Sequence, residues 1–298
     1  MLSDLLKSRV NKIAYYILKL LSVFPPLKSC IYTYGKIGYK ILFPATQNYL
    51  FKDFSTGKYK DSYAALIQMP GWGVNTPPLS IASLSAYLRK HNFKVMPLDI
   101  NIDMYHRNKE KYKEGWLVDV SNFWNNPSMV ERFISDNMSI LGKYVASIIQ
   151  SGARVIGFSI YDSSYLMSCY LAREIKSKAK GKVIVFGGPH ASEFMAGKSI
   201  LIDNPDVDFV VEGEGEDTLL EIVQRVFSGS EVIQCSGTRY RCKGKVCVGP
   251  ERELINNLDA LPFPDFSDFY FPLYKEPFKI PISSSRGCIN QCIYCNER

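Results

Sequence analysis

Five short apolar runs, separated by longer amphipathic segments, dominate the middle of the chain. The runs occupy residues 63–69, 94–99, 154–160, 182–186 and 207–211. Continuous apolar runs of this length are typical of strands buried on both faces, and parallel strands that alternate with helices are joined by helical crossovers. The pattern therefore predicts an α/β fold built on a doubly wound, five-stranded parallel sheet.

Three helices are predicted between or after these runs. The first begins at Pro77-Pro78, which fix the backbone for a helix start, and ends near Asn92. The second spans residues 164–180, and the third follows Glu216. Residues 100–130 show no clear period, so we expect a long insertion there.

The chain divides into four expected parts. Residues 1–60 form an N-terminal extension, and residues 61–230 form the α/β domain. Residues 231–278 contain a predicted hairpin followed by a linker rich in Pro and Phe. Residues 279–298 begin a further domain, with a strand predicted over residues 279–284.

Composition narrows the class of protein. The 298 residues suggest about two domains, and 46% apolar with 22% charged residues exclude a disordered or collagen-like chain. The net charge of +7 comes from the first 60 residues, where ten Lys or Arg are balanced by only two acidic residues, Asp4 and Asp53. Because the main body is close to neutral, we expect no nucleic-acid partner.

Residues 1–28 have the spacing of a basic amphipathic helix. Two interpretations stay open: the helix packs on the domain behind it, or it docks on an anionic membrane surface. No apolar stretch is long enough to span a membrane, and we expect no cleavable signal sequence. With eight cysteines, the chain suits a reducing compartment. We therefore expect a cytoplasmic protein, with peripheral contact at the inner face of the membrane as the alternative.

Three cysteines near the C-terminus carry the strongest chemical signal. Cys288, Cys292 and Cys295 have the spacing C-x3-C-x2-C and follow Arg286-Gly287 and the expected strand. A tight loop of this spacing can bring three thiolates to three irons of one [4Fe–4S] cluster and leave the fourth iron open to a chelating substrate. A zinc site would usually include a fourth Cys or His nearby.

A second group of cysteines lies on the predicted hairpin. Cys235, Cys242 and Cys247 suggest another metal site. They have no fourth ligand there, so the pattern favours free thiols.

Small, polar or glycine-rich segments follow the predicted strands. Ligands of doubly wound folds bind in such loops at the carboxyl ends of the strands, and glycine lets the backbone approach a ligand closely. Ordinary strand-end turns and, for the tryptophan, plain packing are the alternative interpretations. The glutamates also suit turns and a helix N-terminus, where they complement the helix dipole. The candidate ligand-binding residues are Trp72, Asn75, Ser159, Tyr161, Gly187, Gly188, Pro189, Glu212, Gly213 and Gly215.

With the three cysteines near its C-terminus, and an aromatic residue before the third, the sequence resembles the radical S-adenosylmethionine (radical SAM) superfamily. The signature of that superfamily is C-x3-C-x-aromatic-C. The resemblance implies that Cys288, Cys292 and Cys295 ligate a [4Fe–4S] cluster. It also implies that Tyr294 lies against the adenine of S-adenosylmethionine, which the cluster cleaves reductively to a 5′-deoxyadenosyl radical. The order of strand-end segments is similar to that of the class in which a Rossmann-like cobalamin-binding domain precedes the barrel, so the resemblance covers about residues 60–298.

This resemblance assigns the candidate loop residues to cobalamin. Ser159 and Gly187-Gly188 match the regions that hold the nucleotide tail, and Trp72 or Asn75 would face the lower side of the cobalt. The Asp-x-His-x-x-Gly motif, whose His ligates cobalt in other families, is absent. Either cobalamin binds without a His ligand or the domain has lost the cofactor.

The resemblance also implies a reaction. The expected function is methyl transfer to an unactivated carbon by a cobalamin-dependent radical SAM enzyme. The alternatives are a rearrangement or cyclisation enzyme of the same class, and a non-catalytic cobalamin-binding or sensing module with a vestigial cluster loop. The expected partners are a small-molecule, lipid-like or peptide substrate and a reducing electron donor such as flavodoxin or ferredoxin.

Only three residues follow Cys295. A complete βα barrel needs about 200 residues. We therefore expect a radical SAM domain that is truncated just after its cluster motif, with no catalytic residue identifiable and no turnover by the chain as given. We also expect the Pro/Phe-rich segment 259–281 and the cysteine loop to be poorly packed.

Overall fold

The structure is a computed structural model. The basic segment 1–28 lies outside the described residues, as do Cys292, Tyr294 and Cys295. The residues described are 57–117, 122–192, 196–229, 234–242, 244–288 and 290.

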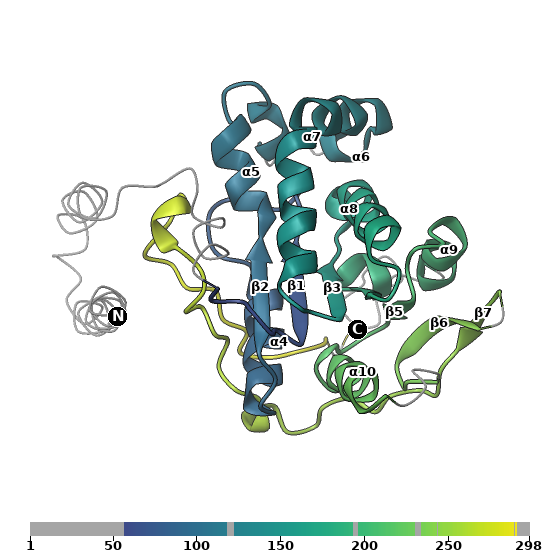
Figure 1. Cartoon of the computed structure of the whole chain (residues 1–298). Coiled ribbons are helices and arrows are strands. Elements are labelled where there is room, and N and C mark those ends of the chain that lie inside the picture. Colours follow the sequence, from purple (N-terminus) through teal and green to yellow (C-terminus); the bar gives the residue numbers. More distant parts are fainter. Residues whose placement is uncertain are drawn as a thin grey trace, which may run out of the picture.

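A single sheet with the strand order β2-β1-β3-β4-β5-β6-β7 forms the centre of the molecule (Figure 1). All neighbours from β2 through β5 are parallel, which confirms the doubly wound prediction. Every residue of β1, β2, β3 and β5 is buried, which explains why these strands read as continuous apolar runs. The strands are β1 (Ala64–Gln68), β2 (Val95–Asp99), β3 (Val155–Ser159), β4 (Val183–Gly187) and β5 (Phe209–Val211).

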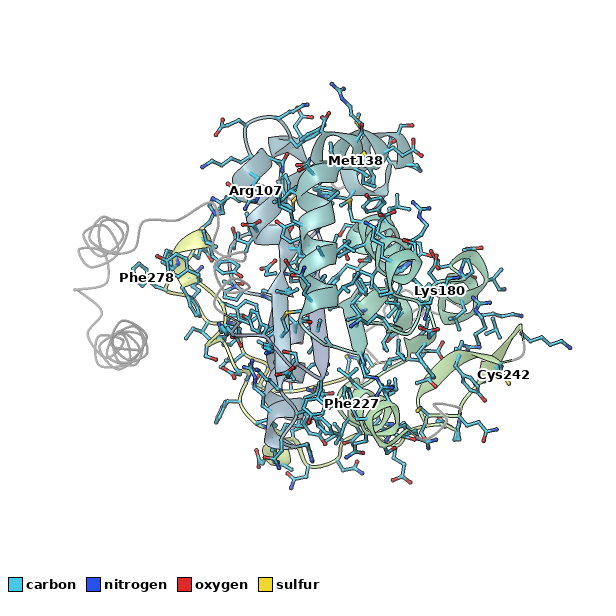
Figure 2. The ribbon with its side chains drawn as sticks, viewed as in Figure 1. Arg107, Met138, Lys180, Phe227, Cys242 and Phe278 are labelled. Atoms are coloured by element: carbon cyan, nitrogen blue, oxygen red, sulfur yellow. The ribbon has the colours of Figure 1, made fainter. Side chains whose placement is uncertain are left out.

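The predicted hairpin extends this sheet, so the sheet has seven strands rather than five. β6 (Thr238–Cys242) is antiparallel to β5, and β7 (Lys245–Val248) is antiparallel to β6. Pairing with β6 satisfies the backbone groups that β5 would otherwise expose as an edge strand. Figure 2 shows Cys242 on this hairpin, at the far end of the sheet from β2.

Helices cover both faces of the sheet (Figure 1). α4 (Leu79–Lys90) and α10 (Glu216–Ser228) contact each other on one face, and α4 begins directly after Pro78, as predicted. α7 (Pro127–Gln150) and α8 (Tyr165–Lys178) pack together on the other face, with α9 (Ala196–Asp203) beside β5. This arrangement follows from right-handed crossovers that run in opposite directions from β1.

The segment 100–130, in which the sequence shows no clear period, is largely helical. It contains α5 (Ile100–Asn108) and α6 (Asn122–Asn125), and α7 begins at Pro127. The first of these helices lacks an amphipathic period because polar residues in it are buried as well: Asp103, 3% exposed, pairs with Arg107 at 2.7 Å. Short 3-10 helices complete the described part: Lys113–Trp116, Asp162–Ser164, Pro189–Ser192, Leu258–Ala260 and Phe271–Leu273.

Much of the Pro/Phe-rich segment is packed against the domain, contrary to expectation, whereas Phe263 and Ile280 are exposed. We call residues 259–276 the strap, because they run along α4 and β2 (Figure 1). Phe269, Leu273 and Tyr274 of the strap are buried. The strap therefore contributes side chains to the hydrophobic core of this domain.

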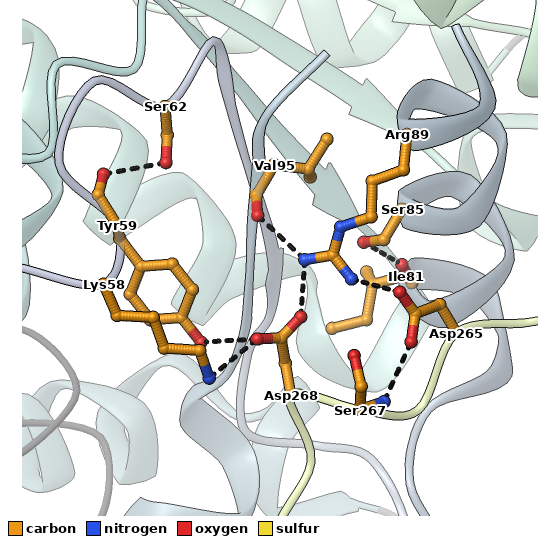
Figure 3. A network of polar contacts seen from close by, with 10 residues as sticks. All are labelled: Lys58, Tyr59, Ser62, Ile81, Ser85, Arg89, Val95, Asp265, Ser267 and Asp268. Atoms are coloured by element: carbon orange, nitrogen blue, oxygen red, sulfur yellow. Dashed lines mark hydrogen bonds and ion pairs between the residues drawn. The ribbon is translucent and has the colours of Figure 1, made fainter. Parts of the chain in front are cut away.

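An ion-pair network holds the first half of the strap (Figure 3). The guanidinium of Arg89, at the end of α4, binds Asp265 and Asp268 and donates to the Val95 carbonyl at 3.0 Å. Asp268, whose side chain is 5% exposed, also pairs with Lys58 at 2.8 Å. These charges fix the strap to a part of the domain far from it in sequence.

Residues 279–284 form no strand, which corrects the prediction. Ile282 is 69% exposed, and no neighbouring strand in the described part offers it ladder hydrogen bonds.

Among the residues that the structure describes, no helix combines the length and the apolar character needed to cross a membrane.

Candidate cofactor site

The sequence candidates gather at the carboxyl edge of the parallel sheet. From β1 the chain proceeds to β2 on one side, whereas β3, β4 and β5 follow on the other. β1 and β3 therefore border the point at which the winding direction changes. Crevices at such points are where doubly wound folds bind ligands.

The loops after β1 and β3 are in direct contact at this point. The indole of Trp72 stacks on the ring of Tyr161, with centroids 4.2 Å apart and planes inclined by 28°. Gly71 makes the approach possible: its φ is +107°, and an added Cβ would lie 2.2 Å from the Ser163 carbonyl oxygen. The structure thus brings together two of the predicted residues, and a glycine is required where their loops meet.

Ser80 links the next two candidates, and the sequence reasoning missed it. The Ser159 hydroxyl donates to the Ser80 hydroxyl at 2.9 Å. Burial raises the pKa of the Tyr161 phenol, an effect that a hydrogen bond with Ser80 opposes. A signal was present, because a polar residue in the first turn of the helix that follows β1 must lie at the same edge of the sheet.

The loops after β3 and β4 are joined through their backbones. Ile160 donates its N–H to the Gly187 carbonyl at 2.7 Å. Gly188 has a φ of +105°, and an added Cβ would lie 2.9 Å from the Ile160 carbonyl oxygen. Pro189 is exposed beside them. The glycine pair therefore serves the packing of the two loops, and both glycines are half-buried at the edge.

The turn after β5 completes the edge. The backbone N–H of Gly213 donates to the Ser192 hydroxyl at 3.1 Å, which ties this turn to the one after β4. Gly215 is the residue preceding the first turn of α10. An added Cβ would meet nothing within 4 Å at Gly213 or at Gly73 in the β1 loop, so both glycines border open space.

Each glutamate of this turn binds a segment that comes later in the chain. Glu212 accepts from Arg239 of β6 at 2.6 Å. Glu214 pairs with Arg286 at 3.1 Å, and Glu216 pairs with the same guanidinium. These hydrogen bonds raise the pKa of Arg286 above its usual range. The pairing suits structural roles for the carboxylates rather than acid–base catalysis.

The strap contacts the β1 loop that carries Trp72 and Asn75. The backbone N–H of Lys275 donates to the Val74 carbonyl, and that of Glu276 to the Asn75 carbonyl, both at 2.9 Å. Asn75 is exposed. The position of this loop therefore depends on the strap as well as on β1.

The histidines occupy different surroundings. His106 bonds the Leu273 carbonyl at 2.7 Å, and burial lowers its pKa. His91 follows α4 and lies against Tyr87. His190, in the loop after β4, is the histidine at the carboxyl edge, and its ring lies 4.9 Å from that of Tyr165.

Cys288 is exposed, and Asn290 donates its N–H to the Cys288 sulfur at 3.5 Å. Because Cys292 and Cys295 lie outside the described residues, the geometry of the cysteine motif does too. Within the described ranges, no three His, Cys, Asp or Glu side chains are grouped as metal ligands. Cys235, Cys242 and Cys247 are free thiols in the structure.

The edge presents uncharged and charge-paired groups to a ligand. It offers backbone groups, hydroxyls and the Trp72–Tyr161 ring pair, while the glutamates of the β5 turn are paired with arginines. The open space beside Gly73 and Gly213 leaves room for close approach to the backbone. These properties fit a corrin ring with a nucleotide tail.

Comparison with known proteins gives a family match. The model of the B12 binding domain matches residues 72–223. An uncharacterized methyltransferase of Pyrococcus horikoshii is 27% identical over 229 residues, which cover 76% of this chain and 41% of that protein. An anaerobic magnesium-protoporphyrin IX monomethyl ester cyclase of Synechocystis is 25% identical over 148 residues, covering 48% of this chain and 29% of the cyclase.

The chain spans less than half the length of these curated relatives. Among solved structures, the cobalamin-dependent S-adenosylmethionine radical enzyme OxsB, with aqua-cobalamin and S-adenosylmethionine bound, is similar at a TM-score of 0.48. That match has 16% sequence identity and covers 73% of this chain and 26% of OxsB.

Proposed function

Because the chain belongs to the B12-binding domain family, we propose that it is the cobalamin-binding portion of a radical SAM methyltransferase and that it holds cobalamin at the carboxyl edge of its parallel sheet. The observation that carries this proposal is the contact of the β1 and β3 loops at the winding switch, where Trp72 stacks on Tyr161. In folds of this kind, that position is the ligand crevice.

The chain's own groups would hold the cofactor in distinct ways. The hydroxyls of Ser159 and Ser80 and the backbone around Gly187-Gly188 are suited to the polar nucleotide tail. Trp72 and Tyr161 offer aromatic surface to the flat ring. Burial keeps the Tyr161 phenol neutral, so it would interact as a hydrogen-bonding and stacking group rather than as a charge.

The cysteine motif would bind the second cofactor. The thiolates of Cys288, Cys292 and Cys295 would ligate a [4Fe–4S] cluster with one open iron, and Tyr294 would lie against the adenine of S-adenosylmethionine. When bound, the cluster and S-adenosylmethionine would supply the radical that abstracts hydrogen from carbon, and cobalamin would supply the methyl group. The proposed partners are an external low-potential electron donor and a small-molecule, lipid-like or peptide substrate.

Cyclisation is the second candidate function. The match to the magnesium-protoporphyrin monomethyl ester cyclase favours it, because that enzyme is similar over 48% of this chain. Both candidates require the same cobalamin edge and the same cysteine motif. They differ in the fate of the substrate, which groups outside this chain's described residues would control.

Anaerobic reconstitution with iron, sulfide and hydroxocobalamin tests the proposal. We expect a stable corrinoid spectrum together with the broad cluster absorption at about 400 nm that thiolate-ligated clusters show. Replacing Cys288, Cys292 and Cys295 by alanine should remove the cluster absorption and leave the corrinoid bound. Gly71→Ala, which forces the β1 and β3 loops apart, should weaken corrinoid binding and leave the cluster in place. A chain that retains neither cofactor after gel filtration would refute the proposal.

A further inference from the structure

Arg286 connects the segment that carries the first cluster cysteine to the sheet domain. Its Nη1 lies 3.1 Å from Glu214 Oε1, and its Nη2 bonds Glu216 Oε1. The three side chains are 31%, 19% and 7% exposed, respectively. One guanidinium thus bridges two carboxylates that are mostly shielded from water.

Contacts other than those with Arg286 also hold the two carboxylates in place. Glu214 accepts the backbone N–H of Ile255 with its other oxygen, at 2.6 Å. Glu216 is the first residue of α10, where a helix N-terminus favours negative charge. Arginine has the planar fork that fits two such acceptors, whereas a lysine ammonium would act as a single point charge.

The bridge also determines where the segment after the strap can lie. Glu276 is bonded to the loop after β1, and Arg286 is bonded to the turn after β5. Both contacts are at the carboxyl ends of strands, and β3 and β4 separate those strands. Three strand spacings are roughly 14 Å, so residues 277–285 must cross the edge at which we place cobalamin.

Cys288 follows Arg286 by two residues, so its Cα stays within about 7 Å of the Arg286 Cα. We infer that Arg286 is a positioning residue that holds Cys288 at the cobalamin edge by bridging Glu214 and Glu216; this role rests on the function proposed above. The arginine would contact neither cofactor. It acts through the backbone that leads into the cysteine motif.

Trypsin tests the bridge without any cofactor. Cleavage after Arg286 releases the peptide 287–298, which mass spectrometry quantifies. The protease can bind the Arg286 side chain only when its guanidinium has left Glu214 and Glu216. We expect the double substitution Glu214→Gln and Glu216→Gln to accelerate this release about five- to tenfold, the size expected when two partly exposed ion pairs are lost. Glu174→Gln, which removes a partly exposed pair with Lys178 on α8, is the matched control and should leave the rate unchanged.

An unchanged release rate in the Glu214→Gln, Glu216→Gln chain would overturn the bridge. If that double variant fails to fold, Arg286→Met provides the second measurement. Its substitution removes the fork while keeping a chain of similar length, and amide hydrogen exchange over residues 283–288 should then accelerate at least fivefold. Equal exchange in the parent chain and in Arg286→Met would refute the bridge as well.

The positioning role has its own readout in the reconstituted chain. A reduced [4Fe–4S]+ cluster and cob(II)alamin are both paramagnetic, and at fixed separation they broaden each other's electron paramagnetic resonance signals. We expect Arg286→Met to lose this mutual broadening while both cofactors remain bound, and Arg286→Lys to retain part of it. Unchanged broadening in Arg286→Met would overturn the positioning role. If the parent chain binds no cofactor, the proposed function fails, and the trypsin result still reports on the bridge separately.

Discussion

The hydroxyl of Tyr274 donates a 2.8 Å hydrogen bond to Oδ2 of Asp99, joining two buried residues 175 positions apart. Asp99 ends β2, and its other oxygen accepts the Ile102 N–H at the start of α5. One carboxyl group thus caps a helix and binds the strap. The contact places a titratable group where the strap meets the carboxyl edge of the sheet.

The first prediction concerns the pH dependence of stability. Burial raises the pKa of Asp99 from 3.8 to about 7. The folded state therefore binds a proton that the unfolded state has released, and the free energy of unfolding should fall as pH rises from about 4 to about 7. At about 1.4 kcal/mol per pKa unit, the loss is up to about 4 kcal/mol. Urea unfolding at pH 4 and pH 8 measures it.

Asp99→Asn should flatten that profile, because the asparagine side chain does not titrate. Asp136→Asn is the matched control, since Asp136 is at the surface and its pKa is lowered by Lys111 rather than raised. The control should keep the slope of the parent chain. Identical slopes in Asp99→Asn and the parent chain would show that Asp99 does not titrate in this range.

Tyr274→Phe tests the same contact from the strap. The change leaves Asp99 Oδ2 without its donor, and we expect a loss of about 1–3 kcal/mol in the free energy of unfolding. The loss should be larger at pH 8 than at pH 5, because the ionised carboxylate depends more on the hydroxyl donor. A double-mutant cycle with Asp99→Asn should show strong coupling, whereas additive effects would argue against the contact.

Arg89→Met should detach the first half of the strap. The substitution leaves Asp268, 5% exposed at its side chain, without the guanidinium. Because Arg89 is itself 28% exposed, we expect a loss of about 2–3 kcal/mol, below the cost of breaking a fully buried pair. Thermal unfolding measures it. Lys111→Met, which removes an exposed pair with Asp136, should change little, and an equal effect would contradict the prediction.

Gly71→Ala should separate the β1 and β3 loops. The added methyl group meets the Ser163 carbonyl, and a φ of +107° is itself unfavourable for alanine. We expect at least about 2 kcal/mol of destabilisation and a change in the near-ultraviolet circular dichroism of the Trp72–Tyr161 pair. Gly181→Ala is the control, because an added Cβ there meets nothing within 4 Å. An unchanged aromatic signal in Gly71→Ala would contradict the loop contact.

Cobalamin should bind base-off, with no histidine on the cobalt. His106 and His91 lie against other groups, and His190, although at the carboxyl edge, packs on Tyr165. The electron paramagnetic resonance spectrum of the Co(II) form should therefore lack nitrogen superhyperfine coupling. His190→Ala should leave that spectrum unchanged, and a changed spectrum would identify His190 as a ligand.

Local pattern was enough to predict the parallel sheet. The strands β1, β2, β3 and β5 are buried throughout, and so are the three central residues of β4, so each is an apolar run that is recognisable without its neighbours. The same logic placed Trp72, Ser159 and Gly187 at one edge, because all carboxyl ends of a parallel sheet lie together. The cysteine motif was likewise apparent, since its information is carried by spacing.

Only the tertiary structure decided what holds that edge together. The contacts of Arg286 with Glu214, of Tyr274 with Asp99 and of Ser159 with Ser80 join residues between 72 and 175 positions apart. No periodicity records such pairs, because each partner alone is an ordinary polar residue. The strap and the helix α5 were misjudged for the same reason: their burial is provided by distant segments, and a sequence pattern registers only burial that repeats along one element.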